Sequence, residues 1–115
     1  MSFFTFCQNN SGGSFDADHG LFVVIEADNA DHANQRAVEE EGLYFDGVQS
    51  GADCSCCGDR WYRAWDSNAA TDSPMIYGKP ATEYRPMIDW GLPFHVKVLY
   101  LNGTETKYPK EGQVT

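Results

Sequence analysis

Residues 21–25 read Leu-Phe-Val-Val-Ile, and residues 29–41 read Asn-Ala-Asp-His-Ala-Asn-Gln-Arg-Ala-Val-Glu-Glu-Glu. The first run is apolar and rich in β-branched side chains, which is typical of a strand in the middle of a sheet. In the second run, small apolar side chains recur at helical spacing, at Ala30, Ala33, Ala37 and Val38. Asp28 or Asn29 is a suitable amino-terminal cap, and Gly42 is suitable for ending a helix. The two runs predict a central buried strand followed by a helix that lies close against the sheet.

Segments near the two ends of the chain predict further strands. Residues 3–8 are rich in aromatic side chains and contain a threonine, as short strands often do. Residues 94–98 alternate in hydrophobicity and residues 99–101 extend the strand, and residues 104–108 alternate again after Asn102 and Gly103. An Asn-Gly pair favours the two-residue type I′ turn of a hairpin. The sequence therefore predicts a C-terminal β-hairpin.

The middle of the chain is less regular. Residues 43–45 predict the start of a strand, residues 60–65 a strand, and residues 75–77 a short strand. Residues 79–93 contain three prolines and are expected to run irregularly. The order of these elements predicts an α+β fold, with a mostly antiparallel sheet and one main helix at about residues 29–41 packed on one face.

We expect one domain over residues 1–108 and a frayed tail over residues 109–115. No apolar stretch reaches the length of about 18 residues that a membrane span requires. The amino-terminal residues lack the basic region and the long apolar run of a signal peptide. These features predict a cytoplasmic protein without a membrane partner, in which the thiols stay reduced.

The chain is acidic, with a formal net charge of −9 that is unevenly distributed. Residues 1–72 carry a balance of −10, whereas residues 73–115 carry +1. Direct nucleic-acid binding is therefore unexpected, because phosphate backbones attract basic proteins. Two interpretations remain: the charge provides solubility, or it forms an acidic face for a basic partner and so mimics nucleic acid. The run Glu39-Glu40-Glu41, where the helix dipole disfavours acids, is interpreted as a solvated face.

The most chemically distinctive stretch is Cys54-Ser55-Cys56-Cys57-Gly58. Two thiolates at the spacing of Cys54 and Cys57 can chelate one zinc ion, and a glycine after the second relieves the tight turn. Cys56 supplies a third thiol and Cys7 is the most economical fourth ligand, with His95 as second choice. The hypothesis is one structural zinc ion, and the alternatives are buried idle thiols or a reactive thiol.

No catalytic residues are predicted. Asp53 and Asp59 flank the cysteines, and nearby acids raise rather than lower the pKa of a thiol. The spacing does not place a histidine beside any thiol, as a cysteine nucleophile requires. A zinc deaminase is excluded because no histidine is followed by glutamate two residues later. We therefore expect a protein that is not an enzyme.

Two segments are candidate sites for a ligand or a protein partner. Asn9, Asn10, Ser11, Gly12 and Gly13 could cradle an anion with backbone N–H groups, or form an ordinary loop. Asp59, Arg60, Trp61 and Arg63 lie in a stretch that combines cations with large aromatic side chains, which dominate binding hot spots. On a strand, Trp61, Arg63 and Trp65 would share one side, and the tryptophans could equally be core residues.

Four stretches together resemble a group of small uncharacterised proteins encoded by tailed bacteriophages. They are QNNSGGSF at residues 8–15, VIEAD at residues 24–28, YFDG at residues 44–47 and DCSCCGDRWY at residues 53–62. The resemblance implies a phage product made in the bacterial cytoplasm, and it brings no known activity.

The resemblance, the lack of a catalytic constellation and the uneven charge lead to one expected function, and the residues leave two alternatives. Small accessory phage proteins often inhibit host proteins, so we expect a non-enzymatic inhibitor of a host or antiviral-defence protein. One alternative is a protein that sequesters a small ligand or nucleotide, with Gly12 and Gly13 on the phosphates and Trp61 or Tyr62 on the base. The other is an acidic nucleic-acid mimic.

Overall fold

The computed structural model describes residues 2–9, 19–51, 58–64, 71–76, 79–81 and 94–108. Within these residues the elements are β1 (Ser2–Cys7), β2 (Phe22–Ala27), α1 (Ala30–Glu41), α2 (Gly47–Ser50), β3 (Met75–Ile76), β4 (Lys79–Pro80), β5 (Val96–Leu99) and β6 (Glu105–Tyr108). The predicted tail at residues 109–115 lies outside the described part. No helix in the described part is long and apolar enough to cross a membrane.

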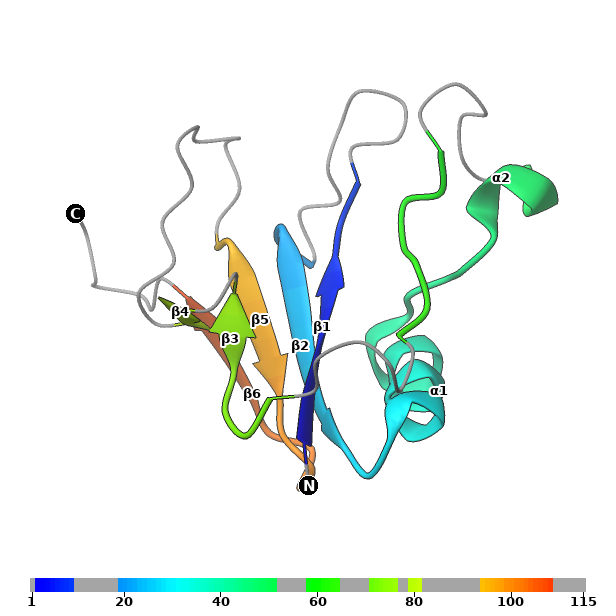
Figure 1. Cartoon of the computed structure of the whole chain (residues 1–115). Coiled ribbons are helices and arrows are strands. Elements are labelled where there is room, and N and C mark those ends of the chain that lie inside the picture. The colour runs from blue at the N-terminus through cyan, green and yellow to red at the C-terminus, as the bar shows by residue number, and fades with distance from the viewer. Residues whose placement is uncertain are drawn as a thin grey trace.

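The main sheet has four strands in the order β1-β2-β5-β6 (Figure 1). The β1–β2 and β5–β6 pairs are antiparallel, and the central β2–β5 pair is parallel. A parallel pair needs a long crossover between its strands, and the chain from β2 to β5 includes α1 and the small β3–β4 sheet. The predicted α+β fold with a mostly antiparallel sheet is confirmed. The parallel β2–β5 pair at the centre of this sheet was not predicted from the sequence.

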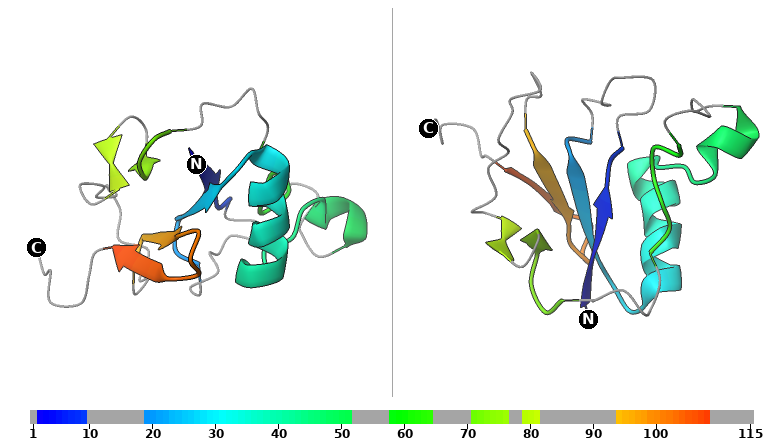
Figure 2. Two further views of the ribbon diagram at one scale, coloured as in Figure 1. Left: turned by 90° about the horizontal axis from the view of Figure 1, so that it is seen from below. Right: turned by 45° about the horizontal axis from the view of Figure 1, so that its top comes forward.

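The sheet lies between two covering layers, with α1 on one face and β3–β4 on the other (Figure 2). Alternate residues of β1 therefore point to different cores. Phe4 and Phe6 pack in the cluster beneath α1, whereas Phe3 packs in the cluster on the β3–β4 side. β2 is buried on both faces, which explains its nearly continuous apolar sequence.

Helix α1 forms where its caps and small side chains predict it. The Asn29 side chain accepts a hydrogen bond from the backbone N–H of His32, and Gly42 ends the helix with φ at 69°. Ala30, Ala33 and Ala37 are buried against the sheet. The expectation for Val38 was wrong, because its side chain is 48% exposed.

The C-terminal hairpin is confirmed, but its turn differs from the prediction. Gly103 N–H donates to the Tyr100 carbonyl and Tyr100 N–H to the Thr104 carbonyl, so three residues form the loop. A type I′ turn needs positive φ at both central residues. Among the described residues only Asp46 combines a side chain with positive φ, so Asn102 does not meet this condition.

Two other predicted strands are absent from the described part of the chain. Residues 43–45 and 60–64 have no strand pairing there, although both segments contribute buried side chains to the core beneath α1. The short strand predicted at residues 75–77 is confirmed at residues 75–76 as β3, which pairs with β4, and residue 77 lies outside the described residues. Of the predicted irregular stretch 79–93, residues 82–93 lie outside the described residues.

Candidate functional site

The segment that follows the cysteines is fixed to the carboxyl end of β1. The backbone N–H of Asn9 donates to the Arg60 carbonyl at 2.9 Å, and Asn9 Nδ2 donates to the Asp59 carbonyl at 3.2 Å. Arg60 Nη1 donates to Gln8 Oε1 at 2.9 Å, and the Gln8 side chain in turn donates to the Gly20 carbonyl. The structure thus brings together Asn9, Asp59 and Arg60, which belong to two separate candidate segments of the sequence. The hydrogen bonds between them hold the chain in place and involve no ligand.

The two flanks of the cysteine segment are also tied to each other. Asp59 Oδ1 accepts the backbone N–H of Val48 at 2.8 Å and so binds the first turn of α2. The residue before this helix, Asp46, has φ at 58° and makes no capping hydrogen bond. Gly58 has φ at +88°, and a Cβ there would lie 3.0 Å from Tyr62 Oη. The left-handed conformation favours glycine at this position, whereas the contact with the exposed Tyr62 side chain could be relieved by a small shift of that side chain.

Both candidates for the fourth metal ligand, the first choice Cys7 and the second choice His95, lie within the described residues. The Cys7 side chain is exposed at the carboxyl end of β1, and Sγ lies 3.8 Å from the Gln8 carbonyl oxygen. Cys54, Cys56 and Cys57 lie outside the described part, as do Asn10, Ser11, Gly12 and Gly13. Within the described part, no three His, Cys, Asp or Glu side chains are grouped to hold a metal. The zinc site therefore stays a prediction.

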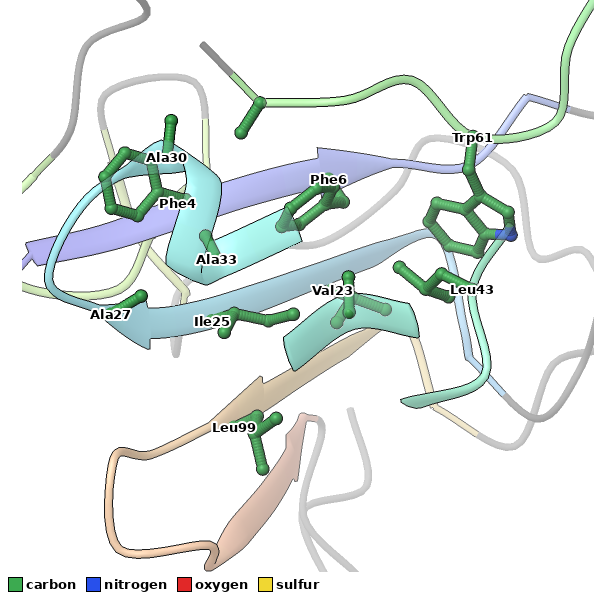
Figure 3. Packing of buried hydrophobic residues seen from close by; sticks show 12 residues of the cluster. Phe4, Phe6, Val23, Ile25, Ala27, Ala30, Ala33, Leu43, Trp61 and Leu99 are labelled. Atoms are coloured by element: carbon green, nitrogen blue, oxygen red, sulfur yellow. The ribbon is translucent and has the colours of Figure 1, made fainter. Parts of the chain in front are cut away.

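Trp61 is a core residue and does not lie on a contact surface. Its side chain is only 1% exposed, and Figure 3 shows the indole beside Leu43 at the end of the cluster beneath α1. The His19 ring packs edge-on against it at a centroid distance of 5.6 Å. This position corrects the expectation that Trp61 contacts a partner and agrees with the alternative that it is a core residue. Among the described residues of this segment, Tyr62 is the exposed aromatic side chain, while Trp65 lies outside the described part.

Tyr62 and Arg63 are the exposed residues of the same segment. The Tyr62 side chain is 58% exposed. Arg63 forms a two-pronged ion pair with Asp46, at 3.0 and 2.6 Å, and its guanidinium lies 5.2 Å from the Phe45 ring centre. Hydrogen bonding to Arg63 lowers the pKa of Asp46. The positive charge of Arg63 is therefore balanced by Asp46, and it does not compensate the charge of other acidic side chains nearby.

Helix α1 and the segment at residues 60–64 run side by side in opposite directions (Figures 1 and 2). The Asn34 side chain joins them, because Oδ1 accepts the Ala64 N–H at 2.7 Å and Nδ2 donates to the Ala64 carbonyl at 2.9 Å. Val38 lies one helical turn beyond Asn34, about 6 Å along the axis. Tyr62 lies two residues before Ala64, about 6–7 Å along the segment. The backbones of Val38 and Tyr62 therefore stand at about the same level, and both residues are exposed. The Tyr62 hydroxyl itself reaches toward Gly58.

Four exposed residues of α1 continue this area along the outer face of the helix. We define the α1–Tyr62 surface as Asp31, Gln35, Val38, Glu39 and Tyr62. The sequence prediction missed its apolar centre, because Val38 directly follows Ala37 and is apolar like the buried alanines. The helical spacing of Asp31, Gln35, Val38 and Glu39 is the signal that could have revealed this face.

The comparisons with known proteins place the chain in a family but bring no activity. Neither the curated proteins nor the solved structures gave a match to this chain. The model of a domain of unknown function, DUF7296, matches residues 1–115. The chain therefore belongs to the family DUF7296, whose function is unknown.

Proposed function

We propose that this protein is a small, non-enzymatic phage accessory protein that binds and inhibits a host or antiviral-defence protein in the bacterial cytoplasm. The observation that carries the proposal is the α1–Tyr62 surface. It has a tyrosine and a valine that are 58% and 48% exposed, beside acidic side chains. Tyrosine is enriched among the residues that contribute most to binding at protein interfaces.

The acidic side chains at the carboxyl-terminal end of α1 do not stabilise the helix, so another role must explain their presence. Glu39 and Glu40 are exposed at the carboxyl-terminal end of α1, and the last turn contains no basic residue. An acid at this end of a helix costs about 0.3–1 kcal/mol, because the helix dipole is negative there. Arg36 binds Glu40, and Glu39 has no such partner in the described part. A role of Glu39 in a charged contact surface explains why the protein tolerates this loss of helix stability.

The chemistry of the surface indicates what kind of partner fits it. A partner with a basic rim around an apolar pocket would neutralise Asp31 and Glu39 and bury Val38 and Tyr62. Such charge complementarity accelerates association and makes it sensitive to salt. A nucleic-acid-binding protein has such a surface, so the nucleic-acid mimic is one form of the same proposal.

We also propose that one structural zinc ion, held by Cys7, Cys54, Cys56 and Cys57, ties the cysteine segment to β1. Two features support this proposal. The Cys7 thiol is exposed at the end of β1. Gly58, the residue after Cys57, lies beside Asn9, since a Cβ at Gly58 would be 3.6 Å from Asn9 Nδ2. Thiolates are ligands that zinc prefers.

Capture of a partner from bacterial lysates, followed by binding measurements with the purified partner, tests the inhibitor function. The variants are Glu39→Lys and Tyr62→Ala, and the matched control is Asp72→Lys, an exposed acid on the β3 side of the molecule. We expect each surface variant to weaken binding at least about tenfold and the control to leave it unchanged. Binding should also weaken as salt increases.

Inhibition is then measured as loss of the partner's own activity when the protein is added. Failure to capture any specific partner from several hosts would contradict the proposal, as would full binding by Glu39→Lys and Tyr62→Ala. A thermal shift with nucleotides, and no protein partner, would instead support the ligand-sequestering alternative.

A further inference from the structure

A buried ionic cluster joins the end of α1 to the sheet, away from the α1–Tyr62 surface. Lys97 Nζ lies 2.9 Å from Glu41 Oε1 and 4.0 Å from Glu105 Oε2. The Glu41 side chain is only 3% exposed and that of Lys97 9%, whereas that of Glu105 is 39% exposed. The expectation that Glu41 belongs to a solvated face was therefore wrong.

The charged groups around this cluster come from every neighbouring element of the described part. Glu41 ends α1, Lys97 lies on β5, and Glu105 and Lys107 lie on β6. His19, just before β2, donates from Nε2 to the Glu41 carbonyl at 2.6 Å. Both lysines lie near the Phe94 ring, with Nζ of Lys97 at 5.8 Å and Nζ of Lys107 at 4.9 Å from its centre.

The two carboxyl groups compete for one buried ammonium group. Burial raises the pKa of Glu41 to about 7, and hydrogen bonding with Glu105 adds to this effect while Lys97 opposes it. The same hydrogen bond lowers the pKa of Glu105. A proton on Glu41 therefore lets it donate to the Glu105 carboxylate while Lys97 stays beside both.

We propose that Glu41, Lys97 and Glu105 form a pH-operated latch, which holds the end of α1 on the sheet while Glu41 is protonated and loosens when Glu41 ionises. Ionisation places two carboxylates and one ammonium in a largely dry site, where unbalanced charge is costly. The residues released by opening are Gly42 and Leu43, whose N–H groups both donate to the Ala37 carbonyl. They begin the chain that leads to α2.

The sign of the pH effect follows from the direction of the shift. The folded pKa of Glu41, about 7, lies above the ordinary value of 4.5. Its contribution to stability is therefore fully present below about pH 4.5 and is lost as the pH rises through 7. The pKa of Glu105 is lowered, so the contribution of Glu105 to stability is lost as the pH falls rather than as it rises, and this happens only at acidic pH. The latch thus opens across neutral pH.

The test combines carboxyl titration by NMR with amide-exchange protection of Gly42 and Leu43 between pH 5 and pH 8. In the natural protein, we expect the Glu41 carboxyl to titrate near 7 and the protection of both amides to fall over this range. Glu41→Gln should abolish the fall in protection. Glu39→Gln, which changes an exposed acid on the same helix, should retain it.

Glu105→Gln serves as a second variant, because its side chain is more exposed and the fold depends on it less. It should move the Glu41 titration to lower pH, since it removes one of the causes that raise the pKa. A Glu41 carboxyl that titrates near 4.5 would overturn the latch, as would a pH-dependent loss of protection that persists in Glu41→Gln. If Glu41→Gln does not fold, an unchanged Glu41 titration in Glu105→Gln is equally decisive against it.

Discussion

Trp61 and Tyr62 are adjacent in the sequence and have opposite environments. The Trp61 side chain is 1% exposed and that of Tyr62 is 58% exposed. The indole fills the end of the core beneath α1, next to Leu43 (Figure 3). Stability therefore depends on the first of these aromatic side chains, and the proposed contact with a partner depends on the second.

Replacing Trp61 by alanine should strongly destabilise the protein. The change removes a large buried side chain and leaves a cavity, which typically costs about 3–5 kcal/mol. Tyr62→Ala should change the free energy of unfolding by about 0.5 kcal/mol or less, because its side chain is largely exposed. Urea unfolding of both variants measures the difference. Equal effects would mean that Trp61 is not a core residue.

At the scale of elements, Arg36 joins helix α1 to the preceding strand β2 and to the end of β5, which is distant in the sequence. Its side chain lies under α1 and is 7% exposed. Nη1 donates to the Glu26 carbonyl on β2 at 2.7 Å, and Nη2 donates to the Tyr100 carbonyl beyond β5 at 2.9 Å. It also forms an ion pair with Glu40, and this hydrogen bonding lowers the pKa of that carboxyl. One guanidinium thus fixes the helix to the parallel strand pair.

Arg36→Leu should therefore cost more stability than the loss of its ion pair alone. The change leaves two backbone carbonyls without this donor, at about 1–3 kcal/mol for a buried unsatisfied group. Glu40→Ala removes an exposed partner only and should cost about 1 kcal/mol or less. Chemical denaturation measures both variants. The assignment of Arg36 as the link between elements fails if the two variants lose the same stability.

At the scale of the whole molecule, the segment after the cysteines is attached to a part of the chain far away in sequence, because Asp59 and Arg60 bind Asn9 after β1. Asp59 also binds Val48 in α2, which lies on the other flank of the cysteines. The proposed zinc ion would add a metal bridge from Cys7 to the same region. Such a bridge stabilises a small domain because the unfolded chain does not form the site.

We expect the purified protein to contain about one zinc ion per chain, measured by atomic emission. A strong chelator should lower the melting temperature. Cys7→Ser and Cys57→Ser should each reduce the zinc content, and Ser55→Ala, a change within the same segment, should not. Zinc-free protein with four titratable thiols and an unchanged melting temperature would exclude the structural zinc ion.

The sequence alone determined the elements whose signals are local. The apolar run of β2, the alanines and caps of α1 and the alternation of the hairpin each involve residues close together in the chain, so periodicity and capping chemistry suffice to predict them. The meeting of Asn9 with Asp59 and Arg60 was only partly foreseen, as candidate residues in two separate segments. Their hydrogen bonds show them to be neighbours.

Only the tertiary structure decided features that depend on distant residues. It set β2 beside β5 in parallel, and it buried Trp61 while leaving Tyr62 and Val38 exposed. It also paired Glu41 with Lys97, which are 56 residues apart in the sequence. The local sequence does not distinguish which of the three glutamates at residues 39–41 is buried. Burial depends on the elements that pack around each side chain, and these are distant in the sequence. The last glutamate became part of the core because the end of α1 meets β5, where Lys97 supplies the opposite charge.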